Sequence, residues 1–163
     1  MLYLNVMNKE KILISACLLG ENCKYDGTNN EVKKLKELTK YYDLIPICPE
    51  VNGGLKTPRY KSEISNTRVI TENGKDVTDF FNDGAYWAYC IAIKFKIKIA
   101  ILKDKSPSCG VYNVYDGTFK NKLVDGSGIT TKLLKKANVK VLDENEALKF
   151  LQELETLNHD KNI

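Results

Sequence analysis

Short apolar runs rich in β-branched residues alternate with segments of helical periodicity along this chain, and this alternation restricts the fold more than any other feature. Runs of four to eight such residues between turn signals are typical of strands, whereas apolar residues three and four apart are typical of amphipathic helices. The predicted strands are 11–17, 43–48, 98–102 and 139–143. The predicted helices are 31–42, 78–96, a segment beginning near Ile129, and 145–157. This order predicts a single α/β domain over residues 11–155. Its core would be a mostly parallel, doubly wound (flavodoxin-like) sheet of about four to five strands, with helices on both faces.

Two other segments are predicted to be β-hairpins added to this sheet. One covers residues 65–78 with Asn73-Gly74 at its turn, and the other covers 111–124 with Asp116-Gly117 at its turn. Thr78 or Asp79 is expected to cap the helix that follows the first hairpin. Residues 1–10 are interpreted as an N-terminal extension and residues 156–163 as a C-terminal tail.

The charge and hydropathy patterns argue against several classes of protein. The 163 residues carry a formal charge of +4, and the basic residues are spread along the chain apart from a mild cluster at Lys132, Lys135 and Lys136. A protein that binds a nucleic-acid polymer would need a concentrated basic stripe. No apolar run reaches the roughly 18 residues that a membrane span needs, and the first residues lack the features of a signal peptide. We therefore expect a cytoplasmic protein with neither nucleic acid nor membrane as its partner.

Three of the five cysteines follow predicted parallel strands. Cys17 ends the first strand, Cys48 ends the second, and Cys109 lies in the loop after the third. Ligands of an open parallel sheet bind outside the carboxyl ends of its strands. Glycines and prolines in these loops let the backbone approach a bulky inorganic group. The pattern predicts a metal or iron–sulfur site.

Three thiolates leave one coordination position open, which is the mark of a catalytic site. Thiolates favour zinc, copper(I) or iron–sulfur clusters. A zinc ribbon or finger is not indicated, because the chain has no CxxC pair and its only histidine, His159, lies near the C-terminus. Cys90 stands among apolar residues of a predicted helix and is expected in the core. Cys23 can be a fourth ligand, a sulfur relay or an inert loop residue, and its spacing from Cys17 does not decide among them.

Three motifs resemble those of a bacterial family that includes thiouracil desulfurases. They are SACLLGENCKYDG from Ser15, CPEVNGGLKTPR from Cys48 and SPSCG from Ser106. The resemblance extends from residue 11 to near residue 150, and the order of the three motifs makes it specific. It implies a 4Fe-4S cluster held by Cys17, Cys48 and Cys109, with one iron open to substrate.

The resemblance also implies roles for an acidic residue at Glu50 and a serine at Ser106. Removing sulfur from a C=S group requires a soft Lewis acid, an attacking water and a group that moves protons. Glu50 is two residues from Cys48 and is the candidate general acid/base. Ser106 or Ser108 is expected to orient the substrate or the water, and spacing alone does not decide which.

Tyr25, Asp26 and Arg59 are the candidate substrate-binding residues. Tyr-Asp-Gly is equally an ordinary turn sequence. Arg59 either binds an anionic group of the substrate or pairs with Asp26 or Glu50.

The expected function is that of an iron–sulfur-dependent desulfurase, which releases sulfide from a thiolated nucleobase such as the pyrimidine thiouracil, or from a related thioamide, by net hydrolysis without redox change. Such a protein would contact the cluster-assembly machinery transiently. An alternative is a small-molecule sensor or sulfur carrier without turnover, and a third possibility is a zinc-bound structural domain. A positioned acid such as Glu50 favours the enzyme, since a carrier has no need of one.

Overall fold

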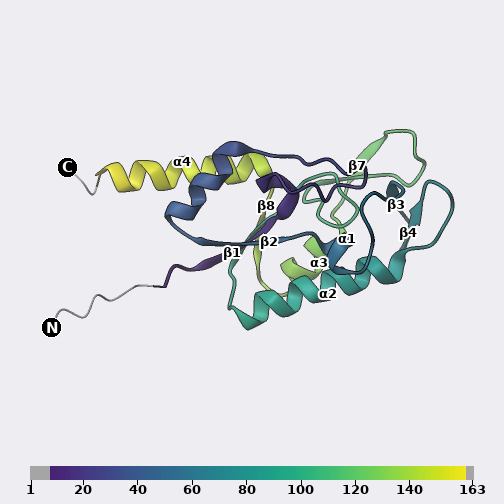
Figure 1. Cartoon of the computed structure of the whole chain (residues 1–163), viewed down its shortest axis with the longest axis horizontal. Helices are drawn as coiled ribbons and strands as arrows, with labels where there is room; N and C mark the ends of the chain where they lie inside the picture. Colours follow the sequence, from purple (N-terminus) through teal and green to yellow (C-terminus); the bar gives the residue numbers. More distant parts are fainter. Residues whose placement is uncertain (1–7, 161–163) are drawn as a thin grey trace.

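A four-stranded parallel sheet forms the centre of the protein, in a computed structural model that describes residues 8–160 (Figure 1). Its strands are β1 (Lys11–Ser15), β2 (Asp43–Ile47), β5 (Ile99–Ile101) and β8 (Lys140–Leu142), in the spatial order β2-β1-β5-β8. In register, Leu13 of β1 stands beside Ile45 of β2 and Ala100 of β5. The strand order reverses between β1 and β5, which makes their boundary the topological switch point of the sheet.

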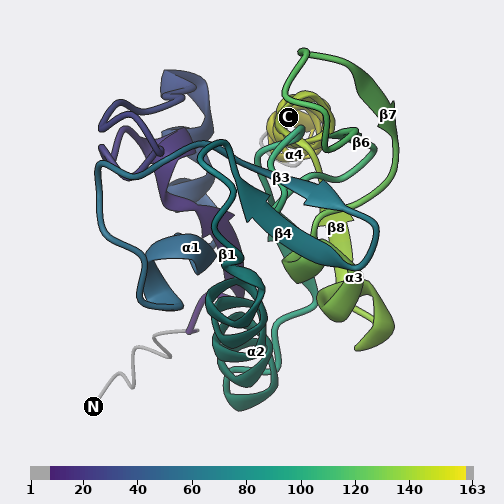
Figure 2. The same cartoon turned by 90° about the vertical axis from the view of Figure 1, so that its right-hand side faces the viewer.

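Helices cover both faces of the sheet, as predicted (Figure 2). On β1, Leu13 faces one side and Ile12 and Ile14 face the other, because successive side chains alternate across a strand. Leu13 packs with residues of α2 (Thr78–Lys94) and α3 (Ile129–Lys136). Ile12 and Ile14 pack with η2 (Lys33–Lys40) and α4 (Glu144–Asp160). All three side chains are buried, so β1 is apolar on both faces.

The strands end earlier than the sequence predicted, and this changes the setting of two cysteines. Cys17 lies in the 3-10 helix η1 (Ala16–Leu19) directly after β1. Cys48 is the N-cap of the short helix α1 (Pro49–Asn52) after β2. The predicted helix 31–42 is also shorter and is a 3-10 helix, η2. Its buried Leu35 and Leu38 are three residues apart, a spacing that aligns side chains in 3-10 geometry.

The first predicted hairpin is paired differently from the expectation. β3 (Ser62–Ser65) pairs antiparallel with β4 (Arg68–Thr71) through a turn containing Asn66, whose φ is 57°. The predicted turn at Asn73-Gly74 does not join two strands of a hairpin. It lies between Ile70 and Asp76, which form an isolated antiparallel β-bridge. The second hairpin joins β6 (Asn113–Tyr115) to β7 (Leu123–Asp125), as predicted, but through the long loop 116–122.

Three further expectations are corrected by the structure. The N-cap of α2 is Val77, because the Thr78 hydroxyl bonds to Asp76 and to the backbone N–H of Val69. Cys90 is exposed on the outer side of α2, since the buried side of this helix carries Ala85, Ala88 and Ala92. Residues 156–160 continue α4, so this part of the expected tail is helical.

The predictions for residues 1–7 and 161–163 fall outside the described residues. No helix within 8–160 is long and apolar enough to span a bilayer.

Helix α1 is fixed by an unusually close approach to α2. A Cβ added to Gly84 of α2 would lie 1.8 Å from the carbonyl oxygen of Pro49, and one added to Gly53 would lie 1.9 Å from that of Phe80. Both glycines are therefore required for the two backbones to touch. Pro49 stands between Cys48 and Glu50, so this contact sets the position of both.

We expect Gly84→Ala to lower the free energy of unfolding by about 1–3 kcal/mol, because the new methyl group overlaps the Pro49 carbonyl. Urea unfolding followed by circular dichroism measures the change. Asn82→Ala, on the exposed side of the same helix, is the control and is expected to stay within about 0.5 kcal/mol of the parent. Alanine is the better helix former by about 1 kcal/mol, so a stabilised Gly84→Ala protein would show that the contact does not constrain α1.

Candidate active site

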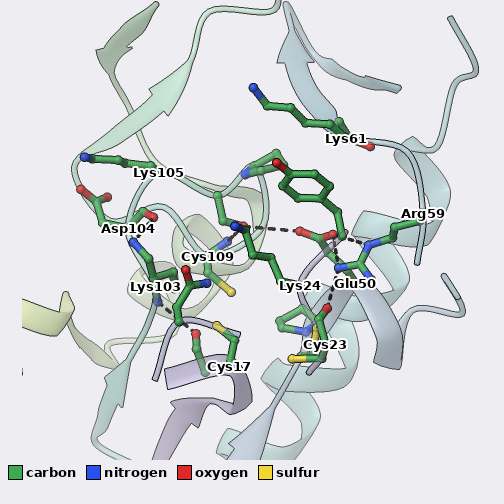
Figure 3. A pocket seen from close by; sticks show the side chains of 18 of the residues that line it. Cys17, Cys23, Lys24, Glu50, Arg59, Lys61, Lys103, Asp104, Lys105 and Cys109 are labelled. Atoms are coloured by element: carbon green, nitrogen blue, oxygen red, sulfur yellow. Dashed lines mark hydrogen bonds and ion pairs between the residues drawn. The ribbon is translucent and has the colours of Figure 1, made fainter. Parts of the chain in front are cut away.

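A cavity of about 340 Å³ opens at the carboxyl ends of β1, β2 and β5, next to the switch point of the sheet (Figure 3). The loops after these three strands bring Cys17, Cys23, Cys48 and Cys109 to its wall. The sequence predicted the meeting of Cys17, Cys48 and Cys109. Cys23 joins them because the loop after η1 folds back over the same edge.

Backbone contacts hold each cysteine-bearing segment in place. The carbonyl of Cys17 accepts hydrogen bonds from the backbone N–H groups of Gly20 at 3.3 Å and Asn30 at 3.0 Å. The N–H of Cys48 donates to Oδ1 of Asn52 at 3.0 Å. The carbonyl of Cys109 accepts a bond from the Thr131 hydroxyl at 2.8 Å. The three segments are thus ordered by the protein itself.

The loop that carries Cys109 is organised around the buried carboxylate of Asp104. Its Oδ1 accepts the backbone N–H groups of Val111 at 2.7 Å, Tyr112 at 3.0 Å and Asn113 at 3.2 Å. Burial raises the pKa of Asp104, but these backbone donors outweigh burial and hold its pKa below the usual value. A charged carboxylate therefore gathers the loop at neutral pH.

The four thiols differ in their ease of deprotonation. The Cys23 side chain, whose single S–H can serve one of the two sulfurs at a time, lowers the pKa of Cys17 and lowers that of Cys48 to about 7, both against the opposing effect of burial. The same contacts raise the pKa of Cys23. Burial raises the pKa of Cys109, which is only 6% exposed. The thiols of Cys17 and Cys48 are thus the more easily deprotonated ones. Cys109 must lose its proton when it binds a metal.

Glu50 and Arg59 form an ion pair beside the cysteines. Nε and Nη2 of Arg59 lie 2.8 and 2.7 Å from Oε2 of Glu50, and the two side chains are only 9% and 15% exposed. The sequence left open whether Arg59 pairs or binds an anion, and the structure shows the pair with Glu50.

The structure separates the two serines of the SPSCG motif. Ser106 lines the cavity, and its hydroxyl lies 3.5 Å from Oε1 of Glu50. The Ser106 oxygen also accepts the backbone N–H groups of Ser108 and Cys109, each at 3.1 Å. Ser108 is fully buried and bonds to Thr130 at 2.9 Å, so of the two alternatives the geometry favours Ser106. The Ser108 hydroxyl anchors the loop to α3 instead.

Tyr25 lines the cavity, but Asp26 does not. The carboxylate of Asp26 accepts bonds from the N–H and hydroxyl of Thr28 at 3.1 and 2.6 Å. This is an Asx turn, in which a side chain stabilises its own loop. The substrate-binding role expected for Asp26 is therefore not supported, and the ordinary turn interpretation holds.

The sequence did not identify the residues that frame the cavity mouth. Lys61 from the segment before β3 has its Nζ 3.3 Å from Oδ1 of Asn121 and 4.3 Å from the ring centre of Tyr115. Asn121 and Tyr115 belong to the β6–β7 hairpin. The buried Glu63 of β3 fixes this hairpin, because its Oε2 accepts the N–H groups of Gly117 at 3.1 Å and Phe119 at 3.0 Å. These contacts join residues more than 50 positions apart, so no local sequence pattern predicts them. Lys103, which directly follows the apolar run of β5, and Ser15 at the end of β1 are lining residues that the strand-end rule could have found.

The donor set suits a soft metal group. Three thiols from separate loops and a fourth nearby face one cavity, and thiolates favour zinc, copper(I) or iron–sulfur clusters. Across residues 8–160, no three His, Cys, Asp or Glu side chains are grouped to hold a single metal ion. In a cluster, by contrast, each cysteine binds a different iron. The donor chemistry of three thiols in one cavity fits a cluster bound by Cys17, Cys48 and Cys109.

Comparison with known proteins gives consistent matches. The sequence matches the family model described as 2-thiouracil desulfurase over residues 12–146. The protein YbbK of Bacillus subtilis (strain 168) is 37% identical over 145 residues, which cover 83% of this chain and 96% of YbbK. A solved structure of TudS, a 4Fe-4S-dependent thiouracil desulfidase, is 39% identical and superposes with a TM-score of 0.84, covering 91% of this chain and 99% of TudS.

The pKa differences predict an order of thiol labelling in the cluster-free protein under reducing conditions. Because the thiolate is the nucleophile, Cys48 should react with iodoacetamide at a rate that rises with pH, with a midpoint near 7, and then levels off. Cys109 should stay unlabelled at pH 8. Mass spectrometry of peptides measures both rates, with exposed Cys90 as an internal reference. Equal labelling of Cys109 and Cys48 would contradict this account of the site.

Proposed function

Because the chain belongs to the 2-thiouracil desulfurase family, we propose that it is a 4Fe-4S-dependent desulfidase that removes sulfur from a small thiolated pyrimidine such as thiouracil. The observation that carries this proposal is the presence of Glu50 and Ser106 in the same cavity as the cysteines. A sensor or a sulfur carrier has no need of a carboxylate and a hydroxyl aimed at its ligand.

In this proposal Cys17, Cys48 and Cys109 hold the cluster, and one iron has no protein ligand. Each of the three follows a different strand of the rigid sheet. Cys23 lines the same cavity and is expected to remain a neighbour of the cluster, because the cysteines after the three strands already supply its three ligands. When bound, the cluster would supply a soft Lewis-acidic iron for the sulfur of the substrate.

The net reaction is a hydrolysis in which C=S and water give C=O and hydrogen sulfide, with no change of oxidation state. Glu50 would take a proton from the attacking water at Oε1 and return it to the departing group. Both acceptor sites of the Ser106 oxygen are used by backbone N–H groups, so its hydroxyl proton is free to point towards Glu50 or a bound water. The 3.5 Å separation of Ser106 and Glu50 is long for a hydrogen bond, as catalytic contacts often are before substrate binds.

The substrate ring would lie between the cysteines and the cavity mouth. A volume of about 340 Å³ is within the range of small-molecule sites. Tyr25 offers an aromatic surface at the wall. We propose a cytoplasmic location, since thiols persist in reducing compartments, and a transient contact with cluster-assembly machinery.

Anaerobic reconstitution with iron and sulfide should give about four irons per chain and sulfide release from 2-thiouracil. Cys109→Ala should lose both, because it removes a ligand. Cys90→Ala is the matched control, since Cys90 is an exposed cysteine on α2, and should keep both. Iron content, the visible spectrum and released sulfide are the measurements.

Cys23→Ser should retain the iron, and loss of the cluster in that variant would make Cys23 a ligand. Zinc in place of iron would overturn the cofactor assignment.

Glu50→Gln should keep the cluster and lower kcat by about 10²–10⁴-fold, the usual range for loss of a general acid/base. Glutamine preserves the shape of the side chain but cannot accept and return a proton. Single-turnover sulfide release by protein with verified iron content is the measurement. Full activity in this variant would remove Glu50 from the mechanism. Binding of thiouracil without turnover by the unmodified protein would favour a sensor.

A further inference from the structure

All three nitrogens of the Arg59 side chain already have protein partners. Nε donates to Oε2 of Glu50 at 2.8 Å, and Nη2 forms an ion pair with the same oxygen at 2.7 Å. Nη2 also donates to the carbonyl of Cys23 at 3.0 Å. Nη1 donates to the carbonyl of Lys56 at 3.3 Å and the hydroxyl of Thr57 at 3.1 Å. With every nitrogen of the guanidinium group engaged by the protein, Arg59 is not arranged to receive a substrate anion.

This arrangement also distinguishes the two oxygens of Glu50. Oε2 accepts the Nε–H of Arg59 and forms an ion pair with Nη2, whereas Oε1 has only the long contact with Ser106. Both contacts fall on the same oxygen, so Arg59 anchors Oε2 and leaves Oε1 as the oxygen that can meet other partners. Oε1 faces Ser106, which lines the cavity.

Arg59 also links the loops that carry the cysteines. Its side chain binds the Cys23 carbonyl in the loop after η1, and its backbone N–H donates to the Tyr25 carbonyl at 2.8 Å in the same loop. Through Glu50 it reaches α1, which begins at the residue after Cys48. Through Ser106 the chain of contacts continues to the N–H of Cys109.

We propose that Arg59 is a positioning residue of the reaction, which fixes Glu50 so that Oε1 alone meets the reacting atoms and which tethers the loop of Cys23. It does not bind substrate. Lysine cannot replace it, because one ammonium group cannot supply five N–H donors in a planar fork. The kinetic part of this inference rests on the proposed function.

The test compares Arg59→Met and Arg59→Lys with Arg68→Met, a control at an exposed arginine of β4 that pairs with Asp76. Rates are expressed per cluster, with iron measured for each variant. Both Arg59 variants should lower kcat by about 100-fold, the loss expected when a catalytic group is misplaced by about 1 Å, with KM within about threefold of the parent. A raised KM with unchanged kcat would make Arg59 a substrate-binding residue and overturn the proposal. Equality with Arg68→Met would also overturn it.

The double variant Glu50→Gln/Arg59→Met separates positioning from a general loss of stability. If Arg59 acts through Glu50, its substitution should change the residual single-turnover rate of Glu50→Gln by less than about threefold. A further 100-fold loss would show that Arg59 acts independently of Glu50.

A second measurement does not depend on turnover. In the cluster-free Arg59→Met variant, iodoacetamide should label Cys23 severalfold faster than in the parent protein. The Cys23 carbonyl loses its hydrogen bond from Arg59, so the loop that carries the thiol is held less firmly. An unchanged rate would overturn the tether. If the parent protein releases no sulfide, the proposed function fails, and this labelling experiment still decides the structural half of the inference.

Discussion

All four strands of the central sheet run in the same direction, and the whole site depends on that constraint. The central strand β1 is buried on both faces, so polar chemistry at the middle of the sheet appears where the strands end. The loops after β1, β2 and β5 leave the sheet at one edge and converge beside the point where the strand order reverses. Thiols that are 31 and 61 residues apart in the chain, as Cys17, Cys48 and Cys109 are, thereby reach one cavity.

Close backbone contacts fix parts of the loops at this edge of the sheet. Gly53 and Gly84 let α1 touch α2, and a Cβ on Gly128 would lie 2.2 Å from the carbonyl of Ser108. Asp104 draws three backbone N–H groups around one carboxylate oxygen. Ordering these groups during folding means that little further entropy is lost when a ligand arrives, which is the advantage of a preorganised site.

The sequence was informative where periodicity or strand ends decide the outcome. Strand positions were enough to place Cys17, Cys48 and Cys109 together, although each strand ended a residue or two early. Ser106 and Ser108 could not be distinguished, because a loop has no period to tell a cavity residue from a buried one. The contact of Glu50 with Arg59 was one of several open pairings, and its contact with Ser106 spans 56 residues. Cys90 was misplaced because α2 carries apolar residues on its exposed side as well, including Tyr86 and Ile93.

The cavity has a floor and a rim of different origin. The thiols belong to loops of the parallel sheet, whereas Tyr115 and Asn121 belong to a hairpin that Glu63 ties to β3. The two parts are therefore separable in evolution. Insertions or replacements in the loop 116–122 can reshape the entrance while the residues around the cysteines stay where they are. A lineage with this architecture can change which molecules it admits without rebuilding its reactive centre, and related chains should differ more at the rim than at the floor.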